Sequence, residues 1–152
     1  MAKLTPVGLL LSELVIEVFR VNGLALAAGD RLTRPVGLTS ARWQVMGVVD
    51  HAPTPVAHIA RTMGLTRQSV RETADALVRD GFAMYVDNPH HRTAKLLDLS
   101  DAGRKALREI EAQHALWANQ LGRKLGLAGL QAAVGGLQRA REALETEDAE
   151  SE

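Results

Sequence analysis

The sequence predicts a mainly α-helical fold with one small β-hairpin. Apolar residues recur at three- and four-residue steps through most of the chain, as one face of a helix requires. The pattern changes to alternation only around residues 82–100, and glycine or proline marks most of the boundaries between segments. A chain of 152 residues with 46% hydrophobic content suits one packed domain, so we expect residues 1–152 to form a single domain.

The first predicted helix runs from about Pro6 to Ala28. Its apolar side chains return at helical spacing, at Leu10, Leu11, Leu14, Val15, Val18 and Val21. Gly29 and Asp30 are expected to end this helix. Residues 31–40 are expected to form a loop, because a proline and a glycine interrupt them.

Charged residues interrupt the N-terminal apolar run. Glu13, Glu17 and Arg20 lie within it, whereas a membrane span needs about 20 residues almost free of charge. The chain also has no cysteine, which excludes disulfides, thiolate catalysis and cysteine-ligated zinc. We therefore expect a soluble cytoplasmic protein without a membrane segment, whose first helix is buried or faces a partner.

Three shorter helices are predicted in the middle of the chain, over residues 40–52, 55–63 and 67–80. Each follows a hydroxyl side chain that can accept a hydrogen bond from the first turn. Thr39 or Ser40 is expected to cap the first of them, Thr54 the second and Thr66 the third. Proline directly after Thr54 suits the first turn of a helix.

Alternating apolar residues predict a two-stranded hairpin after these helices. The strands cover residues 82–87 and 95–100, and the loop between them is longer than the tight two-residue type. The side chains expected to share one face of each strand are Phe82, Met84 and Val86 in the first, and Leu97 and Leu99 in the second.

Two long helices are predicted after the hairpin. Ser100 or Asp101 is expected to cap a helix over residues 102–125, and the glycine-containing residues 126–129 to form a bend. A last helix then runs to about residue 148. Apolar residues repeat every seven positions over only two or three heptads, so the pattern predicts helix packing rather than a coiled coil.

Charge is segregated along the chain although its net charge is zero. Residues 31–95 contain nine Lys and Arg against five Asp and Glu, which leaves that segment at +4 and the remainder at −4. Six acidic residues without a basic one form a tail: Glu142, Glu145, Glu147, Asp148, Glu150 and Glu152. A basic face that binds nucleic acid is therefore compatible with the neutral total.

The order of the elements points to that function. A helix, a short helix, a glycine-containing turn, another helix and a hairpin follow one another over residues 39–100. Together they form a winged helix-turn-helix. In this motif the N-terminal residues of the second helix face base edges in the major groove, and the hairpin follows it as the wing. We therefore predict a mainly α fold, in which a winged helix-turn-helix lies between long N- and C-terminal helices.

The second helix of the motif begins with side chains suited to DNA. Arginine pairs with guanine and glutamine with adenine, and free backbone N–H groups at a helix start favour a phosphate. Glu72 could accept from cytosine N4, or could hold Arg71 or Arg79 in place. The candidate contacts in this helix are Thr66, Arg67, Gln68, Ser69, Arg71 and Glu72.

These segments resemble the MarR-type winged-helix transcriptional regulators over nearly the whole chain. LTSARWQVMGVV is similar to the family's second helix, and TPVAHIARTMGLTRQSVRETADALVRDGFA to its helix-turn-helix and first wing strand. DNPHHRTAKLLDLSDAG is similar to the wing and the start of the next helix. The family's usual wing pattern is Asp-Pro-x-Asp-Arg-Arg, and the corresponding positions read Asn88, Pro89, His90, His91, Arg92 and Thr93.

The resemblance assigns roles to the wing residues. Arg92 is expected to reach the minor groove and Lys95 to contact a phosphate, with His90 and His91 beside them. In the family an acidic residue at the position of His91 orients the wing arginine, so this chain departs from the pattern there. Because histidine gains charge as the pH falls, DNA affinity is expected to rise between about pH 7.5 and pH 6.

The resemblance also implies an assembly and a ligand. Members of the family are homodimers whose first and last helices, here about 6–30 and 102–148, interleave. Such a dimer binds double-stranded DNA at a pseudo-palindromic operator, with half-sites about one helical turn apart. Many members respond to small aromatic effectors, which implies a ligand-responsive repressor. The candidate pocket residues are Phe19, Trp43, His114 and Trp117, for which ordinary core packing is the competing interpretation.

Other functions have weaker support. No nucleophile–base arrangement or phosphate-binding glycine loop is present, so we expect no enzyme and no cofactor. Adjacent histidines on an extended loop point apart, and the other three have no local ligand partner, so we expect no metal site. The remaining alternative is a winged-helix dimer that acts as a protein-interaction module without binding DNA.

Overall fold

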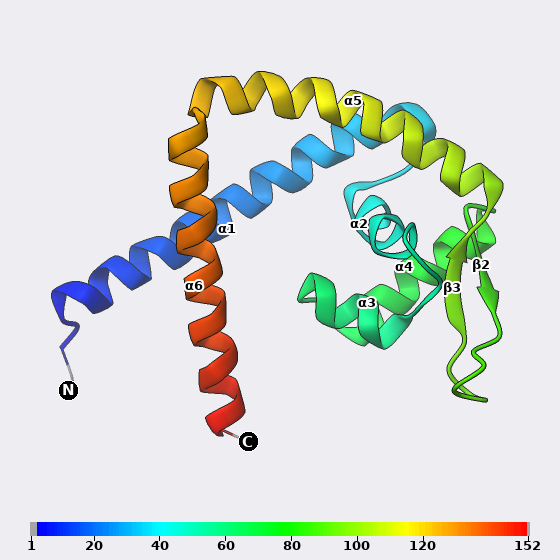
Figure 1. Cartoon of the computed structure of the whole chain (residues 1–152), viewed down its shortest axis with the longest axis horizontal. Helices are drawn as coiled ribbons and strands as arrows, with labels where there is room; N and C mark the ends of the chain where they lie inside the picture. Colours follow the sequence, from blue (N-terminus) through cyan, green and yellow to red (C-terminus); the bar gives the residue numbers. More distant parts are fainter. Residues whose placement is uncertain (1–2, 152) are drawn as a thin grey trace. The chain divides into compact units, whose positions relative to one another are not determined.

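A computed structural model describes the backbone of residues 3–151 and the side chains of residues 3–147. The predicted mainly helical fold with a small hairpin is confirmed (Figure 1). The helices are α1 (Pro6–Thr33), the short 3₁₀ helix η1 (Arg34–Val36), α2 (Ser40–Val49), α3 (Val56–Met63), α4 (Arg67–Arg79), α5 (Asp101–Leu125) and α6 (Leu127–Ser151). The strands are β1 (Thr54–Pro55), β2 (Ala83–Val86) and β3 (Leu96–Leu99).

The chain divides between residues 111 and 112 into two compact units. The first unit contains the elements from α1 to the start of α5, and the second contains the rest of α5 and α6. No helix in the described part of the chain is both long and apolar enough to cross a membrane.

α1 is longer than the sequence predicts, because Gly29 does not end it. The helix continues to Thr33, and most of the expected loop is replaced by its last turn and by η1. Gly29 is buried where α1 meets α2, and a Cβ at this position would collide with Ser40 Oγ. Asp30 accepts a hydrogen bond from the Ser40 N–H at 2.7 Å. Both residues therefore serve the crossing of two helices and not a helix end.

The predicted helix caps are confirmed at three positions and wrong at one. Thr39, Thr66 and Ser100 accept from the first turns of α2, α4 and α5 at 3.3, 3.1 and 3.0 Å. Thr54 caps no helix, since it lies in β1 and α3 begins only after Pro55. α2 also ends at Val49, three residues earlier than expected.

The sheet has three strands where the sequence predicts two. β1 pairs antiparallel with β3, which also pairs antiparallel with β2, so the strand order is β1-β3-β2. Thr54 and Pro55 face Leu97 and Leu96 in this added pairing. A two-residue strand carries too little alternation to be recognised from sequence. It joins the start of α3 to the half of the hairpin nearest the wing loop, where Leu96 pairs with Val86.

The hairpin confirms one predicted face and corrects the other. Leu97 and Leu99 of β3 are both buried as expected. In β2 the alternation has the opposite phase, with Ala83 buried and Met84 45% exposed. The prediction that Phe82, Met84 and Val86 form the buried face is therefore wrong for β2. Because Ala83 pairs with Leu99 and Tyr85 with Leu97, register with the neighbouring strand decides which face is buried.

One hydrophobic core holds the winged helix-turn-helix together. Its largest fully buried side chains come from α2, α3, α4, β3 and α5, and they are Met46, Ile59, Leu77, Leu97 and Ile110. Arg104 of α5 adds ion pairs to Asp98 of β3 at 2.7 Å and to Asp50 after α2 at 3.6 Å. The start of α5 is thereby fixed to the sheet, which in turn positions the hairpin against α4.

The second unit contains the end of α5 and α6. The predicted bend is confined to Gly126, which has a φ of 76°, and α6 begins at the next residue. The positive φ favours glycine here, because other residues rarely adopt it. α6 continues through Gly135 and Gly136. The side chains of Asp148, Glu150 and Glu152, which belong to the predicted acidic tail, lie outside the described residues.

Candidate nucleic-acid interface

The first turn of α4 presents polar groups to solvent. Thr66 Oγ1 accepts from the Ser69 N–H, and Ser69 Oγ donates to the Thr66 carbonyl oxygen, both at 3.1 Å. These bonds satisfy one backbone N–H of the first turn and leave others free for an anion. Val70 and Ala74 are buried, whereas the predicted contact residues around them are exposed. The helix therefore buries one face and offers the other to a ligand.

Glu72 has a different partner from those expected. Its Oε1 accepts from Gln68 Nε2 at 2.8 Å, and it forms no ion pair with Arg71 or Arg79 among residues 3–147. Arg79 instead pairs with Asp80 at the end of the helix. The sequence could have indicated the observed pair, because residues four apart on a helix are neighbours.

The loop between β2 and β3 carries the predicted wing residues. Asn88 begins its turn, since its Oδ1 accepts from the His90 N–H at 3.0 Å and its carbonyl oxygen from the His91 N–H at 3.2 Å. His90, His91 and Arg92 are exposed on this turn, and Lys95 is exposed where the chain returns to β3. Figure 1 shows this loop extending beyond the helices that pack around the base of the hairpin.

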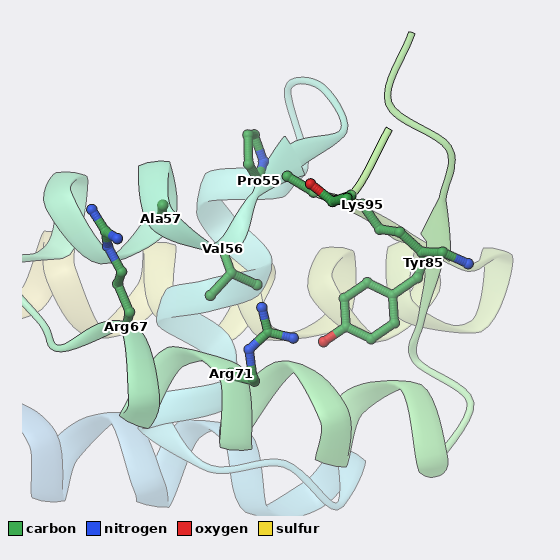
Figure 2. A pocket seen from close by; sticks show the side chains of 9 residues that line it. Pro55, Val56, Ala57, Arg67, Arg71, Tyr85 and Lys95 are labelled. Carbon is green, nitrogen blue, oxygen red and sulfur yellow. The ribbon is translucent and has the colours of Figure 1, made fainter. Parts of the chain in front are cut away.

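A groove of about 400 Å³ lies between α4, the start of α3 and the hairpin. Figure 2 shows Arg67 and Arg71 projecting from α4 into this groove, with Tyr85 of β2 beside Arg71. Lys95 lines the groove from the end of the wing loop, directly before β3. The structure thus brings predicted contact residues of the helix and of the wing to one concave surface.

Tyr85 links the hairpin to α4, and the sequence analysis did not identify it. Its hydroxyl donates to Asp75 Oδ1 at 2.6 Å. Burial, and then the hydrogen bond and charge of Asp75, raise the pKa of Tyr85 to about 12, against a smaller opposing effect of Arg71. The phenol therefore stays neutral and keeps donating at ordinary pH. Tyr85 is the single tyrosine of the chain, a signal that is too general to predict this role.

The acidic and basic side chains of this surface differ in whether they have partners within the protein. The acidic residues of α4 and its end have partners within the protein, since Asp75 accepts from Tyr85 and Asp80 pairs with Arg42 at 2.8 Å. Hydrogen bonding to Arg42 is the main cause that holds the pKa of Asp80 below its ordinary value. The predicted contact cations of α4 and the wing, which are Arg67, Arg71, Arg92 and Lys95, form no ion pair among residues 3–147. Their charge is therefore available to an external anion.

A second hollow, of about 520 Å³, separates α3 from the wing loop. His58 and Arg61 of α3 line it together with Asn88 and His91 of the loop. Sequence reasoning missed the two α3 residues, although their position on the exposed side of a short amphipathic helix could have indicated them. They extend the basic surface from α4 to the far side of the wing.

Comparison with known proteins identifies the family. The sequence profile of the MarR family matches residues 36–92, which run from η1 to the wing. An uncharacterized protein of Mycobacterium tuberculosis is 37% identical over 137 residues, which cover 90% of this chain and 96% of the relative. The chain belongs to the MarR family. Members of the MarR family are transcription regulators and not enzymes, which agrees with the expectation from the sequence.

Solved structures of MarR-family proteins have the same fold. The transcriptional repressor CouR, bound to a 23-mer DNA duplex, superposes with a TM-score of 0.72 at 26% identity, covering 92% of this chain and 99% of that chain. Staphylococcus aureus MarR, in complex with salicylate and kanamycin, gives 0.76 at 14% identity, covering 91% and 95%. The winged-helix architecture predicted from the sequence is therefore that of the MarR family.

The four candidate effector residues of this MarR-family chain lie in both compact units. Phe19 is exposed on α1, and Trp43 of α2 is half-buried against the core of the first unit. His114 and Trp117 lie on α5 in the second unit, with ring centroids 5.7 Å apart. A pocket formed by all four stays a prediction. No group of three or more potential metal ligands occurs among the described residues.

Proposed function

We propose that this protein is a sequence-specific regulator that binds double-stranded DNA through α4 and the wing. The observation that supports this proposal is a set of cations at the groove between these elements that form no ion pair within residues 3–147. They are Arg67 and Arg71 of α4 and Lys95 of the hairpin. Base contacts would come from Gln68 and Arg71, and a minor-groove contact from Arg92. Such a regulator acts in the cytoplasm, together with its operator.

The exposed apolar surface of α1 supports a homodimer. Only Ala28, Gly29 and Thr33 of this 28-residue helix are buried within one chain. Its exposed apolar side chains include Leu10, Leu14, Val18, Phe19 and Leu24. An apolar surface of this extent is typical of a protein interface. A second copy of the chain is the occupant that we propose, and a two-fold axis would then place two α4 helices at two half-sites.

We further propose that the dimer is a repressor whose DNA affinity responds to a small aromatic ligand. The complex of Staphylococcus aureus MarR with salicylate supports this by analogy of fold. Phe19, Trp43, His114 and Trp117 are the side chains proposed to line the site. Alanine variants of Trp43 and Trp117 should lose the shift in DNA affinity caused by an aromatic carboxylate.

Binding of labelled duplexes, followed by fluorescence anisotropy at several salt concentrations, tests the function. The wild-type affinity should fall about 10³-fold or more between 50 and 200 mM salt if six or more phosphates are contacted. Arg92→Ala should weaken binding on most sequences, whereas Gln68→Ala and Arg71→Ala should also change which sequences bind. Arg79→Ala is the matched control, because Arg79 is an exposed arginine in the last turn of the same helix and pairs with Asp80.

The opposite result supports a different class of protein. If the wild type shows no salt-sensitive binding to any duplex, the proposed function is wrong. The chain would then be a winged-helix dimer that binds other proteins. Equal affinities for the wild type, Gln68→Ala, Arg71→Ala and Arg92→Ala would show that DNA binds elsewhere on the protein.

A further inference from the structure

The outward face of α4 carries a carboxylate, that of Glu72, which forms no ion pair with a cation among residues 3–147. Val70, Ala74 and Leu77 define the buried face of this helix. At 3.6 residues per turn, positions 68 and 72 lie about half a turn away from that face. Within the first two turns of α4, Gln68 and Glu72 are therefore the side chains that point most directly away from the core. In a recognition helix this direction leads to the floor of the major groove.

The hydrogen bond between Gln68 and Glu72 limits which base edges these two side chains can bind. Gln68 Nε2 donates one hydrogen to Glu72 Oε1 at 2.8 Å, which orients the amide. The second Nε2 hydrogen and the amide oxygen remain free, and these two groups match adenine N7 and N6. An ionised Glu72 has only acceptors to offer, so it needs a donor on the DNA. In the major groove the donors are the amino groups of cytosine N4 and adenine N6.

We propose that Glu72 is a specificity-determining residue that acts together with Gln68, an inference that rests on the proposed DNA-binding function. Gln68 selects adenine, and Glu72 selects a neighbouring cytosine or adenine amino group. Glu72 excludes guanine from its position on the contacted strand, because guanine presents only the acceptors O6 and N7 there. The same charge repels phosphates, so Glu72 lowers affinity for DNA of other sequences.

Two substitutions separate the charge of Glu72 from its hydrogen bond. Glu72→Gln keeps an oxygen that can accept from Gln68 and adds a donor that tolerates guanine. Glu72→Ala removes both the charge and the orienting bond. Glu72 is exposed, so neither change should affect folding, which thermal unfolding followed by circular dichroism checks. Glu109→Gln is the matched control, since it removes the same charge from an exposed position on α5.

Selection of bound duplexes from a random pool tests the inference. The wild type should enrich a motif with adenine next to cytosine or adenine in each half-site. Glu72→Gln should admit guanine at one of these positions with about tenfold or greater loss of discrimination. It should also bind non-specific DNA several-fold more tightly. Glu72→Ala should lose preference at both positions, and Glu109→Gln should behave as the wild type.

The outcomes that contradict the inference are distinct from those that contradict the function. If the wild type enriches no motif, the proposed function fails and this inference fails with it. If the wild type enriches a motif and Glu72→Gln enriches the same motif with the same base frequencies, only the role of Glu72 is wrong. A motif in which guanine occupies the position that changes in the variants would overturn it as well.

Discussion

Among the glycines of the first unit, Gly103 leaves the least room for a side chain, so Gly103→Ala is a direct test of the packing around the start of α5. The residue is buried in the first turn of α5, and an added Cβ would overlap the carbonyl oxygen of Phe82. That oxygen already accepts from the Ser100 N–H at 3.1 Å. Phe82 directly precedes β2, so the base of the wing would have to move to make room.

The expected cost follows from three contributions. Inserting a methyl group into a close-packed site costs about 1–3 kcal/mol. Weakening the Phe82–Ser100 hydrogen bond adds about 1 kcal/mol. The higher helix propensity of alanine returns at most about 1 kcal/mol. We therefore expect Gly103→Ala to lower the free energy of unfolding by about 1–3 kcal/mol, which corresponds to roughly 2–4 °C in Tm for each kcal/mol.

Gly47→Ala provides the matched control for this measurement. Gly47 is an exposed helical residue of α2, and a Cβ there would meet nothing within 4 Å. The same substitution should therefore raise stability by about 0.5–1 kcal/mol. Thermal unfolding by circular dichroism, at one fixed protein concentration because the protein is a proposed dimer, compares both variants with the wild type. If Gly103→Ala is as stable as the wild type, the close approach to Phe82 is wrong.

One further prediction concerns the hydroxyl proton of Tyr85. Tyr85 is the single tyrosine, so absorbance near 295 nm should report its titration alone, with a midpoint near pH 12 that Asp75→Asn lowers. Because folding raises the pKa of Tyr85, the hydrogen bond to Asp75 stabilises the fold fully below about pH 10, and this stabilisation is lost as the pH rises through 12. A titration midpoint near pH 10 in the folded protein would contradict the contact between Tyr85 and Asp75.

Local signals explain why much of the fold could be predicted from the sequence. Thr66 caps α4 because its hydroxyl reaches a backbone N–H three residues later, a relation that requires no knowledge of the tertiary structure. Leu97 and Leu99 were placed correctly because β3 is the central strand of the sheet, and its buried face alternates along the sequence. The order of these elements is sufficient to indicate a winged helix-turn-helix.

The features that the sequence did not predict depend on contacts between distant segments. Glycine is common where helices end, so the sequence predicts that Gly29 ends α1. Gly29 instead lets α1 approach Ser40 closely, and a close approach of two helices also favours glycine. The phase of β2 depends on its register with β3, so Met84 points outward despite its apolar side chain. Tyr85 and Asp75 meet across ten residues of chain, which no periodicity reveals.

Footprinting of a selected duplex tests the central claim most directly. Hydroxyl-radical cleavage at saturating wild-type protein should show two protected segments, with centres about one helical turn apart on the same face of the DNA. This pattern is expected because a two-fold dimer presents two α4 helices and two wings. Uniform cleavage, or a single protected segment without a symmetric counterpart, would contradict the proposal that paired α4–wing surfaces bind the operator.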